Sequence, residues 1–551
     1  MAQVSTLPNA LLKLHKLIMS DRRDVFSVYF FAIVGGLVSL VLPLGIQAIL
    51  NFVLAVTLST SVIILIVIVI GGVFFNGFVQ IRQMQVIERI RQKIFTRYSL
   101  EFGYRIPQMN LEEMDNHYLP EVVNRFFDVV ALAKSIEKVL VDIPTSIIQI
   151  LLGLILLSFY HPVFIAFGAF VLILLMLLLR LTSNKGFVTS MEASDYKYKT
   201  AGWLQEIARC AKTFKYSKGS NFHIKNTDEL ITGYLGSRTS HFKILNTQYW
   251  SLVGFKVLIV ATMLIAGTWL LLNQQINIGQ FIASDIVIIL IMNSVEKLIG
   301  TMDNVYESLT SIEKLSKIVD SQMEDTGNLS FGDGQNSIIS FKNVGFVYPN
   351  GNVGLKNVSF DIGNDKLVCI RGESGSGRTT ITRLLTGAYP HFTGNILINN
   401  IPINNYKLDE LRKHTGIMFI GQDIFKGTIL ENLIMGNENI TIDEITYLAN
   451  KVGLTDFIIA NKNGYDTELD PMGKKLSNYV IQDIKLMRAL LGKPSLLLLE
   501  EPLQHLNEER KKMLMDYLKN ESNATIVLIS NNKLIQQEAD IVLSLEDGTL
   551  V

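Results

Sequence analysis

The chain is short of cysteine and carries no net charge. Its 551 residues include only two cysteines, Cys210 and Cys369, which excludes a disulfide framework. The 50 basic residues are balanced by 50 acidic ones, and this balance gives no bulk electrostatic attraction to nucleic acid. We therefore expect no nucleic-acid partner.

Charged residues are absent from three long stretches of the sequence. No Asp, Glu, Lys or Arg occurs in residues 25–81, 143–179 or 257–284. A membrane span needs about 20 apolar residues, and a charge at mid-bilayer costs about 2.5–3.5 kcal/mol. The first two stretches are each long enough for two spans, and apolar sequence continues beyond Asp285 in the third. We therefore expect three helical hairpins, with six spans at about 25–49, 58–80, 143–160, 162–181, 251–273 and 277–298.

The basic residues lie between these hairpins and at both ends of the chain. By the positive-inside rule, both termini are cytoplasmic, and Arg22 and Arg23, directly before the first span, agree. This predicts a multi-pass protein of the inner (plasma) membrane. Residues 8–20 have an amphipathic pattern, so we assign residues 1–24 to an N-terminal helix that lies along the inner membrane surface.

Two long polar segments separate the hairpins, at about 82–142 and 182–250. Their helical pattern predicts arms that extend tens of Å from the membrane, at about 1.5 Å per residue. We assign residues 25–320 to a transmembrane domain that includes these arms. The polar, glycine-rich residues 321–336 are expected to be a linker, and residues 337–551 a separate domain.

Short β-like runs alternate with helical segments in this last part of the chain, which indicates an α/β domain. The run at Lys366–Ile370 leads into Gly372-Glu-Ser-Gly-Ser-Gly-Arg-Thr-Thr380, and a helix is expected from Thr379. This is the strand, loop and helix order of a phosphate-binding loop. The other expected strands are at 338–347, 355–362, 496–499 and 524–529. The predicted fold is a membrane α-helical bundle of six spans plus a C-terminal α/β P-loop domain.

The glycine loop predicts a site for a nucleoside triphosphate. Gly372, Gly375 and Gly377 allow backbone N–H groups to converge on a phosphate, and the helix that follows adds its positive end. The hydroxyl of Thr379 suits Mg²⁺, with Thr380 beside it as a further contact for the nucleotide. The expected lysine is replaced by Arg378, which keeps the charge in a longer, planar side chain.

With this loop, the chain resembles the ATP-binding cassette (ABC) family, in particular exporter half-transporters with six spans followed by one cassette. The resemblance implies ATP and Mg²⁺ as cofactors. It makes Tyr348 the aromatic residue that stacks on adenine, and Gln422 a contact to Mg²⁺ and the attacking water. Glu501 corresponds to the general base, and Glu500 to the carboxylate that holds the metal together with Thr379.

The sequence also departs from the family pattern in several elements. Glu500 stands in place of the usual aspartate and adds a methylene in a site with octahedral geometry. The signature Leu-Ser-Gly-Gly-Gln is Leu476-Ser-Asn-Tyr-Val480 here, so Ser477 is kept for the nucleotide while both glycines are lost. The switch histidine is replaced by Asn531, which can hydrogen-bond a phosphate but cannot share a proton as imidazole does.

Together with Arg378, these departures predict a cassette that binds ATP and hydrolyses it weakly. The alternative is a non-hydrolysing scaffold or regulatory half-transporter that is paired with a competent subunit. The resemblance implies either a homodimer or a heterodimer with a second half-transporter. The sequence does not decide between these two states, and it does not identify the substrate.

Two membrane-domain segments, Glu121–Asp128 and Ser158–Pro162, resemble type I secretion and bacteriocin-type exporters. This resemblance implies an exported peptide or protein, and a membrane-fusion or adaptor protein as a further partner. Asp285, inside the sixth span, is a candidate for the substrate path. Lys256, near the inner end of the fifth span, is easier to pair with Glu296 than with Asp285.

Overall fold

A computed structural model describes residues 6–54, 60–114, 119–332 and 337–551. Part of the first hairpin tip and the end of the linker therefore lie outside the described residues. By its internal contacts the chain divides into two units. The first is Met1–Gln108 with His117–Ser321, and the second is Met109–Asn116 with Gln322–Val551.

The first unit contains the predicted membrane spans. Six helical segments are long and apolar enough to cross a membrane, which confirms the six-span prediction. Several helices run without interruption from a span into a polar arm, and α4 alone has 46 residues, about 70 Å at the usual rise. The helices of this unit are α1 (Leu7–Ser20), α2 (Arg22–Ser39), α3 (Val41–Leu54), α4 (Thr60–Arg105), α6 (Leu119–Asn124), α7 (Phe127–Tyr160), α8 (Val163–Arg209), α9 (Ala211–Tyr216), α10 (Phe222–Leu272), α11 (Ile278–Gly300) and α12 (Met302–Val319).

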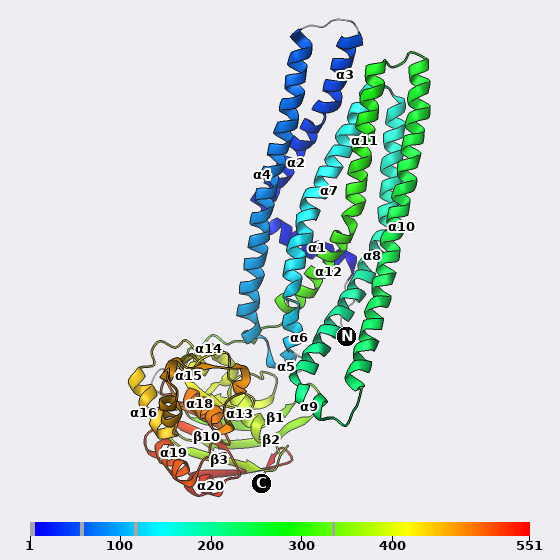
Figure 1. The fold of residues 1–551 in the computed structure, drawn as a ribbon. Coiled ribbons are helices and arrows are strands. Elements are labelled where there is room, and N and C mark those ends of the chain that lie inside the picture. The colour runs from blue at the N-terminus through cyan, green and yellow to red at the C-terminus, as the bar shows by residue number, and fades with distance from the viewer. Residues whose placement is uncertain (1–5, 55–59, 115–118, 333–336) are drawn as a thin grey trace. The chain divides into compact units, whose positions relative to one another are not determined.

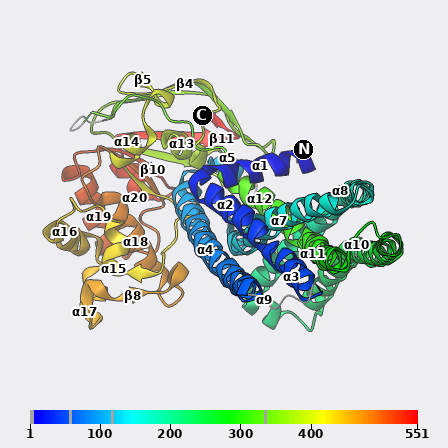
Figure 2. The same cartoon turned by 90° about the horizontal axis from the view of Figure 1, so that it is seen from above.

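The long helices of this unit pack side by side in a defined order. Figures 1 and 2 show α2, α3 and α4 on one side, α8 and α10 on the other, and α7 and α11 between them. Helix α7 packs on α2, α11 and α12, and α8 packs along α10. The apolar residues shared by these helices form one continuous core in this unit.

The structure places the two charged residues that the sequence analysis singled out in the apolar helices, Lys256 and Asp285. Lys256 Nζ lies 2.5 Å from Glu296 Oε2, which confirms the predicted pairing. Asp285 is exposed on α11, on the same helical face as Ile289 and Asn293 because these residues are four apart.

The second unit is built on two larger sheets and a short ribbon. The strand orders are β2-β1-β4-β5 in one sheet, β12-β11-β3-β10-β9-β6 in the other, and β7-β8 in the ribbon. Strands β11, β3, β10, β9 and β6 are parallel neighbours, and helices follow several of them, as the α/β prediction requires. The strands are β1 (Ile339–Val347), β2 (Val353–Ile362), β3 (Leu367–Gly372), β4 (Thr393–Ile398), β5 (Ile401–Pro402), β6 (Thr415–Met418), β7 (Gly427–Thr428), β8 (Glu468–Leu469), β9 (Leu496–Glu500), β10 (Thr525–Ile529), β11 (Ile541–Glu546) and β12 (Thr549–Leu550).

The helices of the second unit surround these sheets, and buried apolar residues fill the space between the layers. They are α5 (Leu111–Met114), α13 (Arg378–Leu385), α14 (Leu408–Lys413), α15 (Ile429–Ile434), α16 (Ile442–Val452), α17 (Thr455–Ala460), α18 (Asn478–Leu490), α19 (Glu508–Asn520) and α20 (Lys533–Glu538).

A short segment of the first polar arm belongs to the second unit, although the sequence assigned it to the membrane domain. The Asn110 amide donates to the Gln322 carbonyl at 3.1 Å, and Leu111 packs against the core of this unit. Glu112 Oε2 also lies 3.4 Å from His391 Nδ1. Residues far apart in the sequence therefore form part of one compact unit.

Candidate functional site

The loops that follow three neighbouring strands meet at one edge of the six-stranded sheet. Strand β10 lies between β3 and β9, and all three are parallel. Because the carboxyl ends of parallel strands share one edge, α/β sheets bind ligands there. β3 leads into the glycine loop, β9 ends in Glu500 before Glu501, and β10 leads to Ser530 and Asn531. The fold thus brings these predicted residues together.

The glycines of the loop are required by its conformation. Gly375 and Gly377 have φ values of +87° and +98°, which side chains rarely tolerate. A Cβ on Gly377 would lie 2.3 Å from the Gly354 carbonyl oxygen, and a Cβ on Gly372 would lie 2.4 Å from the Leu545 carbonyl oxygen. The backbone passes where a side chain does not fit, and the N–H groups at the start of α13 are placed to face an anion.

Arg378 opens α13 and extends to the predicted general base. Its Nη1 lies 4.0 Å from Glu501 Oε1, and its side chain is only 17% exposed. The other oxygen of Glu501 accepts a hydrogen bond from the Ser530 hydroxyl at 2.7 Å. One oxygen of the carboxylate is therefore hydrogen-bonded to Ser530, and the other lies within ion-pair distance of the residue that replaces the family lysine.

Glu500 is buried at the end of β9. Its Oε2 accepts a hydrogen bond from the Ile420 N–H at 3.1 Å. Burial raises the pKa of the Glu500 carboxyl, while the Ile420 amide, Arg383 and the Thr379 hydroxyl act in the opposite direction. Thr379 and Glu500, two of the predicted Mg²⁺ contacts, therefore lie close together.

Three buried polar atoms around the glycine loop have no hydrogen-bond partner among the described residues. They are Ser376 Oγ, Arg378 Nη1 and Glu500 Oε1. Unpartnered buried polar atoms are costly and call for a ligand or water. A hydroxyl and a cation suit phosphate oxygens, and a carboxylate suits a divalent cation. These residues fit a Mg²⁺-nucleotide, with Glu500 and Thr379 to hold the metal.

Tyr348 lies next to the same helix. Its hydroxyl is 3.0 Å from Thr380 Oγ1, and its ring contacts Phe346 and Tyr389 edge to face. The predicted adenine-stacking residue is therefore beside the predicted phosphate site. The Thr380 hydroxyl, predicted as a nucleotide contact, faces this tyrosine in the structure.

Gln422 and Asn531 are both engaged with backbone. Gln422 Oε1 accepts from the Phe419 N–H at 3.3 Å, and its Nε2 donates to the Ile417 carbonyl at 3.2 Å. Asn531 Oδ1 accepts from the Gly372 N–H at 3.2 Å, and its Nδ2 donates to the Gly372 carbonyl at 2.9 Å. The residue at the switch position is thus joined by two hydrogen bonds to the start of the glycine loop.

The altered signature segment begins a helix of its own. Ser477 is the N-cap of α18, but its side chain makes no capping hydrogen bond. Asn478 and Tyr479 follow in the first turn and are exposed. Two exposed side chains, Asn478 and Tyr479, therefore stand where the family has two glycines, and Ser477 before them is half-buried.

Two contributors to the site were not identified from the sequence. Ser530 donates to Glu501, and Gln482 Nε2 donates to the Glu501 and Pro502 carbonyls at 3.0 and 3.1 Å. The position of Ser530 directly before the switch residue is a signal that could have indicated it. Nothing in the local sequence around Gln482 indicates a contact with the loop after β9.

Asp483, on α18, gives the cassette a pH-dependent stability. It is buried, its Oδ2 lies 3.6 Å from Arg510 Nη1, and burial raises its pKa to about 7 against the opposing effect of Arg510. The folded state binds the Asp483 proton more tightly than the unfolded state does. The contribution of Asp483 to the free energy of unfolding is therefore full below about pH 4 and is lost as the pH rises to about 7.

We expect Asp483→Asn to remove this part of the pH dependence, on the order of 1–4 kcal/mol. Thermal unfolding of the full chain in detergent at pH 5 and pH 8 measures it. The gap between the two midpoints should be smaller in the variant than in the wild-type chain. Equal gaps in both proteins would show that Asp483 does not titrate in this range.

The membrane unit contains a cavity of about 470 Å³ between α2, α3, α4, α7 and α11. Apolar side chains form most of its wall. The polar groups among them are neutral amides and hydroxyls, together with one cation that is paired with Asp142 at 2.9 Å. These polar residues are Ser39, Asn76, Gln149, Asn293, Ser294 and Lys297. Asp285 is not among the lining residues.

Comparison with known families matches two parts of the chain. Residues 25–295 match the family described as "ABC transporter transmembrane region", and residues 355–504 match "ABC transporter". The chain also has the fold of a solved structure titled "Structure of a bacterial Atm1-family ABC exporter with ATP bound". The TM-score is 0.86 at 18% identity, over 96% of this chain and 94% of the other.

Several curated proteins are similar in sequence. A β-(1→2)glucan export ATP-binding/permease protein, NdvA of Rhizobium johnstonii, is 31% identical over 52% of this chain and 50% of its own length. The uncharacterized ABC transporter ATP-binding protein YknV of Bacillus subtilis is 30% identical over 51% of this chain and 47% of its own length. An export-type ATP-binding/permease protein of Rickettsia bellii is 26% identical over 84% of this chain and 81% of its own length. The matches to the first two relatives thus span about half of their lengths.

Proposed function

Because the chain belongs to the ABC transporter family, as an exporter-type half-transporter, we propose that it binds Mg²⁺-ATP and hydrolyses it poorly. The observation that carries this proposal is the approach of Arg378 Nη1 to Glu501 Oε1, at 4.0 Å. A general base must be able to accept a proton from water. A carboxylate that accepts a hydrogen bond from Ser530 on one oxygen and has a guanidinium beside the other is less free to turn toward a water molecule.

The other altered residues are also expected to slow ATP hydrolysis. Asn531 occupies both backbone groups of Gly372, and it has no imidazole to share a proton at the phosphate. Glu500 is longer than aspartate and is held by the Ile420 amide. Bound ATP would supply the phosphoanhydride bond. These residues would bind and orient the nucleotide, but they do not provide an effective general base or a histidine at the switch position.

The partner is proposed to be a second half-transporter. In this family each nucleotide site combines the phosphate loop of one cassette with the signature segment of the other. A homodimer would contain two altered sites. A heterodimer with a competent homologue would contain this chain's phosphate loop in one site and its Ser477 in the other. The poor match to the signature pattern favours the heterodimer, because the partner could then supply the glycines.

We propose that both termini are cytoplasmic, in keeping with Arg22 and Arg23 before the first span and the uncharged hairpin tips. The cargo is proposed to be a peptide or protein. Its amides would pair with the neutral amides and hydroxyls of the membrane cavity, such as Asn76, Gln149 and Asn293. A membrane-fusion or adaptor protein would be a further partner. Asp285 is proposed to line the path on α11 beyond the cavity.

Nucleotide binding by the full chain tests the proposal that it binds ATP. With a fluorescent ATP analogue in detergent, Tyr348→Ala should weaken binding by about five- to hundredfold, because stacking on a base contributes about 1–3 kcal/mol. Tyr348→Phe keeps the ring, loses only the hydroxyl that faces Thr380, and should stay near the wild-type affinity. Equal binding by wild-type and Tyr348→Ala would contradict the adenine role.

The second candidate function is a non-hydrolysing scaffold or regulator of a competent partner. It is favoured by the same contacts, in particular those of Ser530 and Arg378 with the Glu501 carboxylate. The two functions differ in residual turnover, since a weak ATPase loses its activity in Glu501→Gln and a scaffold has none to lose.

A further inference from the structure

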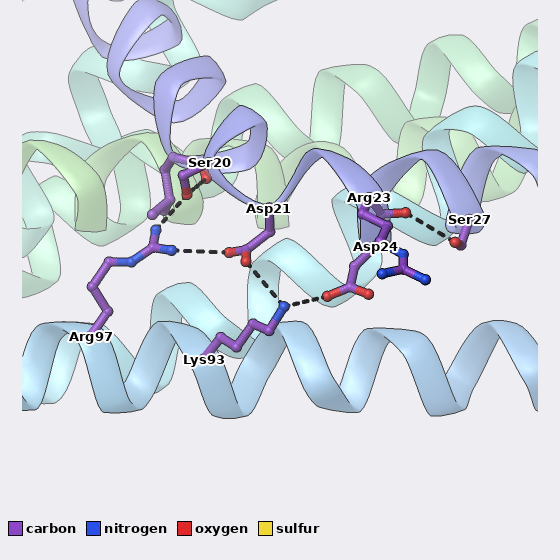
Figure 3. Close-up of polar contacts among 8 residues, drawn as sticks. Ser20, Asp21, Arg23, Asp24, Ser27, Lys93 and Arg97 are labelled. Atoms are coloured by element: carbon purple, nitrogen blue, oxygen red, sulfur yellow. Dashed lines mark hydrogen bonds and ion pairs between the residues drawn. The ribbon is translucent and has the colours of Figure 1, made fainter.

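The bend between α1 and α2 separates charges that the sequence places side by side. Residues Ser20-Asp-Arg-Arg-Asp24 contain two acidic and two basic side chains and have no net charge. In the structure both aspartates turn toward α4, as Figure 3 shows. Lys93 Nζ lies 3.2 Å from Asp21 Oδ1 and 2.5 Å from Asp24 Oδ2, and Arg97 Nη2 lies 3.2 Å from Asp21 Oδ2.

These contacts neutralise the acidic side of the bend. The side chains of Asp21 and Asp24 are only 12% and 17% exposed. The hydrogen bonds to Asp24 and then Asp21 also raise the pKa of Lys93, which keeps it charged. The two aspartates are therefore committed to α4 and do not offset a charge on the outer side of the bend.

The basic residues of the bend remain on the outside. Arg22 and Arg23 are exposed and form no ion pair with any described residue, and the same holds for Lys16, six residues before Arg22 on α1. Lys13 is different, because it pairs with Glu313 and Asp320 on and after α12. The structure thus distinguishes three unpaired cations from those that hold helices together.

Exposed apolar side chains lie next to these cations. Ala10 and Leu14 bury one face of α1 within the unit, whereas Leu11 and Leu12 are exposed on the other face. Phe26, just beyond the arginines, is 72% exposed. The charge-free sequence of the first span starts at this level of the chain. A cationic strip beside apolar anchors at the start of a span matches the boundary between lipid headgroups and acyl chains.

We propose that Lys16, Arg22 and Arg23 form a binding site for the headgroups of anionic phospholipids, with Leu11, Leu12 and Phe26 inserted among the acyl chains. Each basic residue near an anionic membrane surface contributes about 1 kcal/mol. Three such residues favour an anionic over a zwitterionic lipid by about a hundredfold. This inference does not rest on nucleotide binding or hydrolysis.

Native mass spectrometry of the purified full chain tests the site. The chain is titrated in mild detergent with dioctanoyl phosphatidylglycerol or dioctanoyl phosphatidylcholine, and the retained lipids are counted. The wild-type chain should retain phosphatidylglycerol at about a hundredfold lower lipid concentration than phosphatidylcholine. The triple variant K16Q/R22Q/R23Q should lose most of this preference, because the ion pairs of Asp21 and Asp24 are left in place.

A matched control removes the same charge elsewhere. Lys212, Lys215 and Lys218, in and after α9, are exposed and form no ion pair within the described chain. The variant K212Q/K215Q/K218Q should keep the wild-type preference. An equal loss in both variants, or equal retention of the two lipids by the wild-type chain, would overturn the proposal.

A measurement on the wild-type chain alone guards against a variant that fails to fold. Raising the salt concentration from 0.1 M to 1 M shortens the screening length from about 10 Å to about 3 Å. Retention of phosphatidylglycerol should then fall toward that of phosphatidylcholine. A preference that does not change with salt would contradict a headgroup site made of three cations.

Discussion

Replacing Gly377 by alanine should nearly abolish nucleotide binding by the full chain. Gly377 has a φ of +98°, and an added Cβ would lie 2.3 Å from the carbonyl oxygen of Gly354. That oxygen belongs to β2, so it cannot move aside as a flexible side chain would. The backbone strain alone is about 1–3 kcal/mol, or about five- to hundredfold in affinity, and the clash adds to it.

The control for this prediction is Gly363→Ala, in the turn after β2. Gly363 is not among the described glycines with a positive φ. A Cβ added to it would make only an ordinary contact, at 3.9 Å from Lys366 Cγ. Titration of both variants with a fluorescent ATP analogue, alongside thermal unfolding, measures the difference. Wild-type affinity in a folded Gly377→Ala chain would show that nucleotide does not bind at this loop.

Restoring the family residues should raise ATP turnover by about 10²- to 10³-fold, since a positioned acid or base and an electrostatic contact each contribute factors of this size. Arg378→Lys releases the Glu501 carboxylate from the guanidinium, and Asn531→His frees the backbone of Gly372. The shorter aspartate and the two signature glycines complete the site. The full set of substitutions is Arg378→Lys, Glu500→Asp, Asn531→His, Asn478→Gly and Tyr479→Gly.

The order of the gains tests which contact matters most. Because Arg378 lies at the base itself, Arg378→Lys with Glu500→Asp should give a larger gain than the two signature substitutions in a homodimer, where all sites carry the same changes. Adding Glu501→Gln to the repaired chain should remove the gained activity. Turnover that stays at the wild-type level in a repaired chain that binds ATP would show that the limitation lies outside these five residues.

The membrane helices and the cassette fold could be predicted because their signals are local. Charge-free stretches of the required length indicate spans by themselves, and the strand before the glycine loop indicates the α/β domain. The loops after β3, β9 and β10 could be assigned to one site because the resemblance supplied their order. No long-range contact had to be known for these predictions.

The contacts between the altered residues of the site depend on which strands are neighbours in the sheet. A local stretch of sequence does not show this. The approach of Arg378 to Glu501 joins residues more than 120 positions apart, and the pairing of Asn531 with Gly372 joins residues about 160 apart. Both depend on the sheet order rather than on either motif. The same is true of the bend before the first span, where the two arginines lie between the two aspartates in sequence, and the aspartates pair with residues of α4.

The central claim is that the chain binds ATP but hydrolyses it weakly. Measuring ATP affinity and ATP turnover on the same protein tests this claim directly. The purified full chain in lipid is compared with Glu501→Gln for ATP affinity and steady-state phosphate release. We expect both proteins to bind ATP with similar affinity and the wild-type turnover to exceed that of the variant by less than about tenfold, against about 10²-fold or more for a working base. A wild-type turnover of several per second that Glu501→Gln abolishes would contradict this account.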